Sequence, residues 1–223
     1  MCAVAKGETR MTLVAFDFDG TLSDSEMTVL LGAKQGVAEE MADITERAMN
    51  DEISYAESLR KRASLLDGLD EADARAAYEA VTLRPGAADV IRALQDEGHT
   101  TAILTGGFID GVEAALAREG VAVDYLVAND LPVEDGHLTG TVTGPLIEGT
   151  KDEALEDLAS SLSTDIADTI AVGDGANDLP MLEVAGLAVG FQPKGAVRPH
   201  CDVVVATMDR LHDVLAERDV LAE

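Results

Sequence analysis

The chain has 223 residues, enough for one α/β domain of ordinary size plus a smaller inserted module. Its hydrophobic content of 47% supports a buried core and argues against global disorder. Acidic residues number 43 against 16 basic ones, and the net charge is -27. Neither nucleic acid nor an anionic membrane is therefore an expected partner, because both would be repelled.

The acidic residues are spread along the whole chain. This composition resembles that of proteins from salt-loving cytoplasms, especially haloarchaeal ones, and an acidic protein of an ordinary cell is the alternative. Cys2 and Cys201 have no Cys or His neighbours, so neither a disulfide framework nor a zinc site is expected. No signal peptide or membrane-length apolar run is evident, so a cytoplasmic location is expected. The expected oligomeric state is a monomer or a homodimer.

The first predicted element is a buried strand over residues 12–16, which leads directly into the acidic segment DFDGT. Residues 27–78 follow a helical pattern, and Arg84, Pro85 and Gly86 mark its end. Helix, strand, helix and strand then alternate over 88–129, which is typical of a parallel sheet with crossover helices.

Residues 131–149 contain an Asp-Gly turn between polar arms and are predicted to form a β-hairpin. A helix from Lys151, a strand ending in GDGAND, two further strands and a last helix complete the chain. The fold class predicted is α/β: a Rossmann-like three-layer sandwich with a parallel sheet, a helical insertion after the first strand and a small hairpin insert.

The segment DFDGT places two carboxylates after a strand, with one residue between them. We expect Asp17 to attack phosphorus. Asp19 would donate a proton to the leaving group and then accept one from the attacking water. Gly20 would allow a tight turn beside the phosphate. By itself the segment is modest evidence, because a surface loop carrying two capping residues is an alternative.

The segment GDGAND offers a second group of polar side chains after a strand. Mg²⁺ prefers carboxylate and substrate oxygens, so Asp174 is a candidate ligand. Asp178 would order Lys151 or a water on the cation, and Asn177 would donate to a substrate oxygen. A turn that caps a helix uses the same residue types.

Thr105, Gly106 and Lys151 are candidate phosphate-binding residues. A hydroxyl and the amides of a Gly-Gly turn can bind a phosphoryl oxygen. A lysine at the start of a helix is disfavoured by the helix dipole unless it neutralises an anion. Each of these features alone is compatible with an ordinary turn or a solvated side chain.

Taken in order, DFDGT, LTGG, a lysine and GDGAND resemble the haloacid dehalogenase superfamily. The resemblance implies a core over residues 1–23 and 85–223, a helical cap domain over 24–84, and the hairpin insert at 131–149. It also implies that the Asp17 side chain, the Asp19 main-chain carbonyl and Asp174 hold Mg²⁺, with Asp17 as nucleophile.

The segment 45–66, with LTGGF, VANDL, DGHLTG and VGDGANDLPML, is similar to the phosphoserine phosphatase family. That resemblance implies that Glu26 binds the substrate ammonium and Arg62 its carboxylate, and that Met49 and Tyr55 shape the pocket. Gly20 and Thr105 depart from a more usual Ser, and Tyr55 departs from a more usual Phe, so that the pocket gains a hydroxyl.

The expected activity is Mg²⁺-dependent hydrolysis of a phosphomonoester through a phospho-aspartyl intermediate, with O-phospho-L-serine, the precursor in the last step of serine biosynthesis, as substrate. Another small phosphate, such as phosphohomoserine, a sugar phosphate or a phosphorylated head group, remains an alternative substrate. A non-catalytic binding protein on the same fold is the alternative from another functional class.

Overall fold

A six-stranded parallel sheet forms the centre of the molecule, with the strand order β3-β2-β1-β6-β7-β8. The computed structural model describes residues 11–49 and 52–222, and of Met49 it describes only the main chain. The strands are β1 (Leu13–Phe16), β2 (Thr100–Phe108), β3 (Tyr125–Asn129), β6 (Thr169–Gly173), β7 (Leu187–Phe191) and β8 (Val203–Val205). The α/β class and the parallel sheet predicted from the sequence are confirmed.

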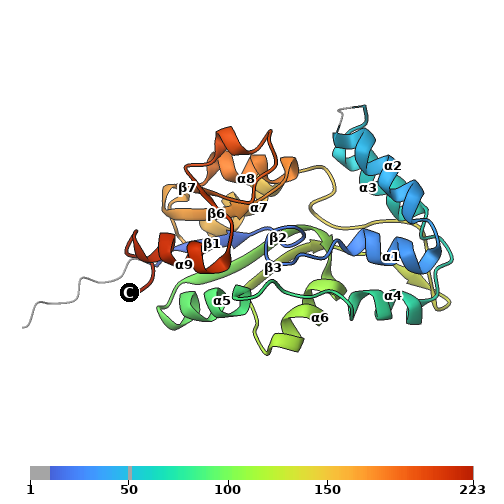
Figure 1. Ribbon diagram of the computed structural model, residues 1–223, viewed down its shortest axis with the longest axis horizontal. Coiled ribbons are helices and arrows are strands. Elements are labelled where there is room, and N and C mark those ends of the chain that lie inside the picture. Colours follow the sequence, from blue (N-terminus) through green and yellow to red (C-terminus); the bar gives the residue numbers. More distant parts are fainter. Residues whose placement is uncertain (1–10, 50–51, 223) are drawn as a thin grey trace, which may run out of the picture.

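Side chains alternate between the two faces of the sheet, and both faces are covered by helices. In β1, Val14 and Phe16 belong to one apolar cluster, whereas Leu13 and Ala15 belong to another. The first face packs against α5 (Ala87–Asp96), α6 (Ile109–Glu119) and α9 (Met208–Ala216), and the second against α7 (Lys151–Ser161) and α8 (Leu179–Val184) (Figure 1). Strands buried on both faces explain why the sequence shows continuous apolar runs.

Four helices lie between β1 and α5, as the helical pattern predicted. They are α1 (Met27–Gln35), α2 (Ala38–Met49), α3 (Tyr55–Ser64) and α4 (Glu71–Tyr78), and they form a lobe at one end of the sheet (Figure 1). Ser54 and Asp70 cap α3 and α4 by accepting hydrogen bonds from Glu57 N and Ala72 N. None of the helices in the described ranges has the length and apolarity needed to cross a membrane.

The predicted hairpin is present, with short arms β4 (Val133–Glu134) and β5 (His137–Leu138). Asp135 and Gly136 both have positive φ, at 52° and 80°, as a tight two-residue hairpin turn requires. Gly136 and Leu138 accept main-chain hydrogen bonds from Glu71 and Gly68, so the hairpin contacts the segment that leads into α4.

The Gly-Gly segment differs in detail from the prediction. It was expected to form a turn after the strand, but β2 continues through Gly106 and Gly107 to Phe108. The pairing of β2 with β3 shifts register between Leu104 and Phe108. A local irregularity in the strand, rather than a turn, therefore presents these glycines at the edge of the sheet.

Candidate active site

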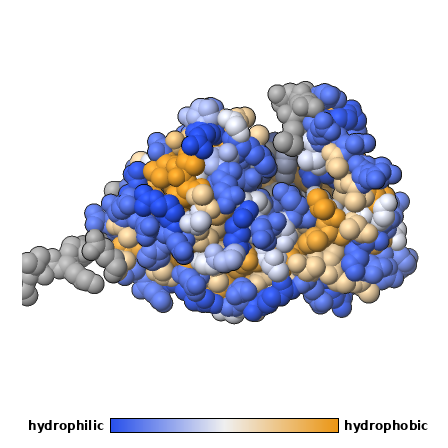
Figure 2. All heavy atoms as spheres, in the orientation of Figure 1, coloured by the Kyte–Doolittle hydropathy of each residue, from blue (hydrophilic) through white to orange (hydrophobic). Residues whose placement is uncertain are grey.

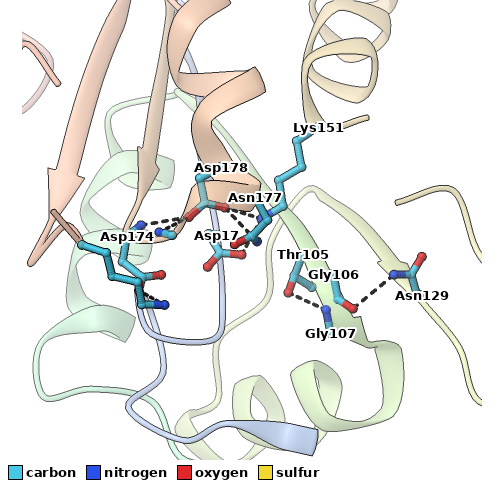
Figure 3. A network of polar contacts seen from close by, with 11 residues as sticks. Asp17, Thr105, Gly106, Gly107, Asn129, Lys151, Asp174, Asn177 and Asp178 are labelled. Atoms are coloured by element: carbon cyan, nitrogen blue, oxygen red, sulfur yellow. Dashed lines mark hydrogen bonds and ion pairs between the residues drawn. The ribbon is translucent and has the colours of Figure 1, made fainter. Parts of the chain in front are cut away.

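The acidic segments meet at the carboxyl ends of neighbouring strands. β1 lies between β2 and β6, and Asp17 follows β1 directly while Asp174 follows β6. Ligands of open α/β sheets bind where the strand order reverses, which here is beside β1. Figure 3 shows Asp17 with Asp174 to one side and Thr105 to the other.

Lys151 forms ion pairs with the carboxylates of Asp17 and Asp178. Its Nζ donates to Asp17 Oδ1 at 2.5 Å and to Asp178 Oδ1 at 2.6 Å, and all three side chains are at least 97% buried. Burial alone would lower the pKa of Lys151, but the two carboxylates outweigh it and raise the pKa above its usual value. Lys151 is therefore a permanent cation in the site, where its place at the start of α7 is offset by two anions.

Asp178 positions its neighbours. Its Oδ2 accepts hydrogen bonds from the main-chain amides of Asp174 and Gly175, at 2.9 and 2.8 Å. Its Oδ1 accepts from Lys151 and, at 3.3 Å, from Asn177 Nδ2. Because both oxygens are engaged, Asp178 holds Lys151 and the main chain at Asp174.

The surroundings of Asp17 disfavour its ionised form, which an additional positive charge would stabilise. Burial, followed by the carboxylates of Asp178 and Asp174, raises the pKa of Asp17, and only Lys151 opposes them. Asp17, Asp174 and Asp178 each offer one carboxylate oxygen, and these three oxygens lie within 4.8 Å of one another. Such a cluster could hold a metal ion. Asp17 Oδ2 has no hydrogen-bond partner in the described part of the chain. These donors fit a small hard cation.

Gly20 leaves space for this arrangement. Its φ of +88° disfavours any side chain, and a Cβ there would lie 2.8 Å from the carboxylate atoms of Asp174. Arg84 holds the same loop by donating from Nη2 to the Gly20 carbonyl at 3.1 Å. Gly20 therefore does more than turn the chain: it makes room for the Asp174 carboxylate.

The surroundings of Asp19 favour the protonated form of its carboxyl group. Burial, then the carboxylates of Glu26 and Asp17, raise its pKa well above the usual value. Its Oδ1 is buried and has no hydrogen-bond partner among the described residues, while a Cβ on Gly107 would lie 2.8 Å from its Oδ2. The carboxyl group thus lies beside the Thr105–Gly107 segment with one oxygen unused.

Thr105 and Gly106 lie opposite the acidic cluster. Thr105 Oγ1 accepts a hydrogen bond from Gly107 N at 3.0 Å, which leaves its own hydrogen available for a ligand. Asn129, at the end of β3, donates from Nδ2 to the Gly106 carbonyl at 3.1 Å and accepts from Leu146 N at 3.0 Å (Figure 3). The adjacent strand therefore fixes the orientation of this peptide.

The helical lobe contributes Glu26, Arg62 and Tyr55. Glu26 is exposed and lies at the N-terminal end of α1. Desolvation by the surrounding protein atoms raises its pKa, whereas the positive charges of Lys194 and then Arg62 lower it. Arg62 donates to Thr28 Oγ1 at 3.2 Å, and its buried Nε has no partner within the described ranges. The Met49 side chain lies outside the described residues.

Lys194, Asn129 and Arg84 were not predicted from the sequence to be site residues. Lys194 Nζ lies 3.1 Å from Asp174 Oδ2, so it is a second cation in the site. Lys194 follows β7 and Asn129 ends β3, so the rule that selected residues after strands could have selected both. The position of Arg84 after the helical segment gave no comparable signal.

Comparison with known proteins places this geometry in a family. A model of the haloacid dehalogenase-like hydrolases matches residues 14–183. The chain belongs to this hydrolase family. Its sequence is 54% identical to the phosphoserine phosphatase of Halobacterium salinarum over 94% of this chain and 100% of that protein. The resemblance to phosphoserine phosphatases, based on motifs, is thereby confirmed.

Two solved structures of phosphoserine phosphatases are similar to this chain in fold. A substrate-bound phosphoserine phosphatase superposes with a TM-score of 0.86 and 36% identity, covering 94% of this chain and 99% of that one. A phospho-aspartyl intermediate analogue of a phosphoserine phosphatase superposes with a TM-score of 0.84 and 36% identity, covering 93% of this chain and 98% of that one.

Proposed function

We propose that this protein hydrolyses O-phospho-L-serine to L-serine and phosphate, with Asp17 as nucleophile and Mg²⁺ as cofactor. The main support is the buried network in which Lys151 holds Asp17 and Asp178, beside an Asp19 carboxyl group whose pKa is raised. The relative from Halobacterium salinarum, named phosphoserine phosphatase, supports the substrate.

In the first step, Asp17 attacks phosphorus and the bond to the serine oxygen breaks. Lys151 neutralises charge on the phosphoryl oxygens, and the hydroxyl of Thr105 donates a hydrogen bond to them, with Asn177 and the Gly106 amide as further donors. Asp19 gives its proton to the departing serine oxygen, for which its raised pKa is suited.

In the second step, water replaces Asp17 at phosphorus. Asp19, now ionised, accepts a proton from this water, and the acyl phosphate on Asp17 is hydrolysed to release phosphate. Asp178 keeps Lys151 in place throughout, because it accepts from Nζ at 2.6 Å.

The residues that would hold Mg²⁺ are Asp17, through its side chain, Asp19, through its main-chain carbonyl, and Asp174. When bound, the cation would supply charge neutralisation at the phosphoryl oxygens. The buried carboxylates and the space left by Gly20 support this assignment.

Substrate selection is assigned to the helical lobe. Glu26 would bind the ammonium group and Arg62 the carboxylate, with Met49 and Tyr55 shaping the pocket. In a chain of 43 acidic residues, Arg62 forms no ion pair with any described residue, which suits a guanidinium that receives a carboxylate from a ligand. The domain division proposed is a core of 1–23 and 85–223, a cap of 24–84 and the hairpin insert 131–149.

The surroundings proposed for the enzyme are the cytoplasm of a halophile, where it acts on a small solute as a monomer or homodimer, without nucleic acid or membrane partners. The net charge of -27 supports this proposal. Hydrophilic residues cover most of the face shown in Figure 2, and the hydrophobic patches between them are small and separate.

The test is phosphate release from O-phospho-L-serine, phosphohomoserine, a sugar phosphate and p-nitrophenyl phosphate, with and without Mg²⁺, at low and at molar KCl. We expect Mg²⁺-dependent release that favours phosphoserine, and none from Asp17→Asn. Substantial turnover by Asp17→Asn would refute the nucleophile. Release from other substrates alone would refute the substrate and leave the chemistry in place.

A matched pair of substrates tests the recognition residue. Arg62→Ala should raise the KM for phosphoserine far more than that for p-nitrophenyl phosphate, which has no carboxylate. An equal effect on both substrates would remove Arg62 from carboxylate recognition.

A further inference from the structure

Tyr55 reaches from the helical lobe onto the edge of the sheet. Its side chain is half-buried, and its hydroxyl oxygen lies so close to Gly106 that a Cβ on that glycine would be 1.7 Å away. The first turn of α3 therefore places a hydroxyl group directly over the Thr105–Gly107 segment. Only a glycine at position 106 permits this contact.

The charges that act on this hydroxyl are those of the candidate active site. Burial raises the pKa of Tyr55 to about 12, with Lys151 and Arg62 opposing and Asp17 and Asp178 adding to the increase. The hydroxyl is therefore protonated at neutral pH and is a hydrogen-bond donor. It makes no hydrogen bond to any residue in the described ranges, so the donor is available to a ligand.

We propose that the Tyr55 hydroxyl donates a hydrogen bond to the phosphoryl group of the substrate, as a further side-chain donor beside Thr105, Lys151 and Asn177. This inference rests on the proposed function and adds to it a direct contact between the helical lobe and the group being transferred. A phenylalanine at this position could not make the contact, because it lacks the hydroxyl group.

The position of the hydroxyl favours the phosphate over the carboxylate of the substrate. Gly106 belongs to the same segment as Thr105, and three of the four charges that act on the hydroxyl belong to the network around Asp17. Arg62 is the one charge of the carboxylate side. A donor placed among Gly106, Lys151 and Asp17 meets the oxygens on phosphorus.

The decisive measurement is the affinity for inorganic phosphate, determined by titration calorimetry on the full chain in Mg²⁺-containing buffer. Tyr55→Phe removes one oxygen atom and should raise the Kd for phosphate about tenfold, as loss of a hydrogen bond to a charged group does. Tyr125→Phe, on the exposed side chain of β3, is the matched control and should leave the Kd unchanged.

Kinetics separate this inference from its alternatives. Tyr55→Phe should lower kcat/KM for phosphoserine and for p-nitrophenyl phosphate by the same factor. An unchanged phosphate Kd with a raised KM for phosphoserine alone would overturn the inference and place the hydroxyl on the carboxylate. Tighter phosphate binding would overturn it by showing that the hydroxyl obstructs the site.

The phosphate titration does not depend on the identity of the organic group. If phosphoserine is not hydrolysed but Tyr55→Phe still weakens phosphate binding, the proposed substrate is wrong and the inference about Tyr55 stands.

Discussion

Lys194 and Asp174 are linked twice, through their side chains and through their main chains. Lys194 Nζ lies 3.1 Å from Asp174 Oδ2, and Lys194 N donates to the Asp174 carbonyl at 2.9 Å. The lysine side chain is about half exposed, whereas Asp174 is buried. An amine therefore shares the carboxylate that is proposed to bind a divalent cation.

This pair predicts that Lys194 weakens metal binding. Lys194→Gln should tighten Mg²⁺ binding about fivefold, because a half-exposed charge pair contributes on the order of 1 kcal/mol. Titration calorimetry measures the effect, which should shrink in molar KCl. Lys34→Gln removes the same charge from an exposed position and should have no effect. Weaker Mg²⁺ binding by Lys194→Gln would show that the lysine supports the site.

A second prediction concerns the space beside Asp174. Gly20→Ala should weaken Mg²⁺ binding, because its Cβ would lie 2.8 Å from the Asp174 carboxylate. Gly36→Ala is a close control, since Gly36 also has a positive φ, of +79°, but has open space around it. Both variants should lose roughly 1 kcal/mol of stability from the backbone conformation, and only Gly20→Ala should lose metal affinity. Equal metal affinities in the two variants would contradict the argument.

A third prediction compares two lysines whose ion pairs are similar in length but differ in burial. Lys151→Met should lower the free energy of unfolding by about 3 kcal/mol or more, because it leaves two buried carboxylates uncompensated. Lys61→Met breaks an exposed pair with Glu57 at 2.6 Å and should cost less than about 1 kcal/mol.

Urea unfolding in the presence of a chelator measures both variants of this pair. Adding Asp178→Asn to Lys151→Met should recover part of the loss, because one buried charge is removed. A double variant that is less stable than Lys151→Met would refute this account of the network.

A fourth prediction uses the pH dependence of stability. Folding raises the pKa of Asp19 well above its ordinary value of 3.8, so the folded chain holds this proton more tightly than the unfolded chain does. The contribution of Asp19 to stability is therefore largest at low pH and is lost as the pH rises toward its raised pKa. Asp19→Asn lacks this loss, so its Tm relative to the unsubstituted protein should increase with pH.

The measurement is thermal unfolding from about pH 4 to pH 8 with a chelator present. Asp157→Asn, at an exposed position on α7, should show no such trend. A Tm difference for Asp19→Asn that falls with pH would show that Asp19 is ionised and stabilised in the folded chain.

The sequence by itself determined the fold class and the edge of the sheet where the polar segments meet. Short apolar runs separated by helical patterns indicate strands buried on both faces, and the carboxyl ends of parallel strands share one edge. For that reason Asp17 and Asp174, each directly after a strand, lie together at this edge. Local patterns are sufficient for this conclusion because it depends only on strand direction and order.

Tertiary structure alone decided which side chains touch at that edge. The contact of Tyr55 with Gly106, the ion pair of Lys194 with Asp174 and the hydrogen bond from Asn129 to Gly106 join segments that are distant in the chain. Contacts of this kind depend on how helices and loops pack, and no local propensity encodes them. The raised pKa values of Asp17 and Asp19 likewise arise from burial and from neighbours that only the folded chain brings together.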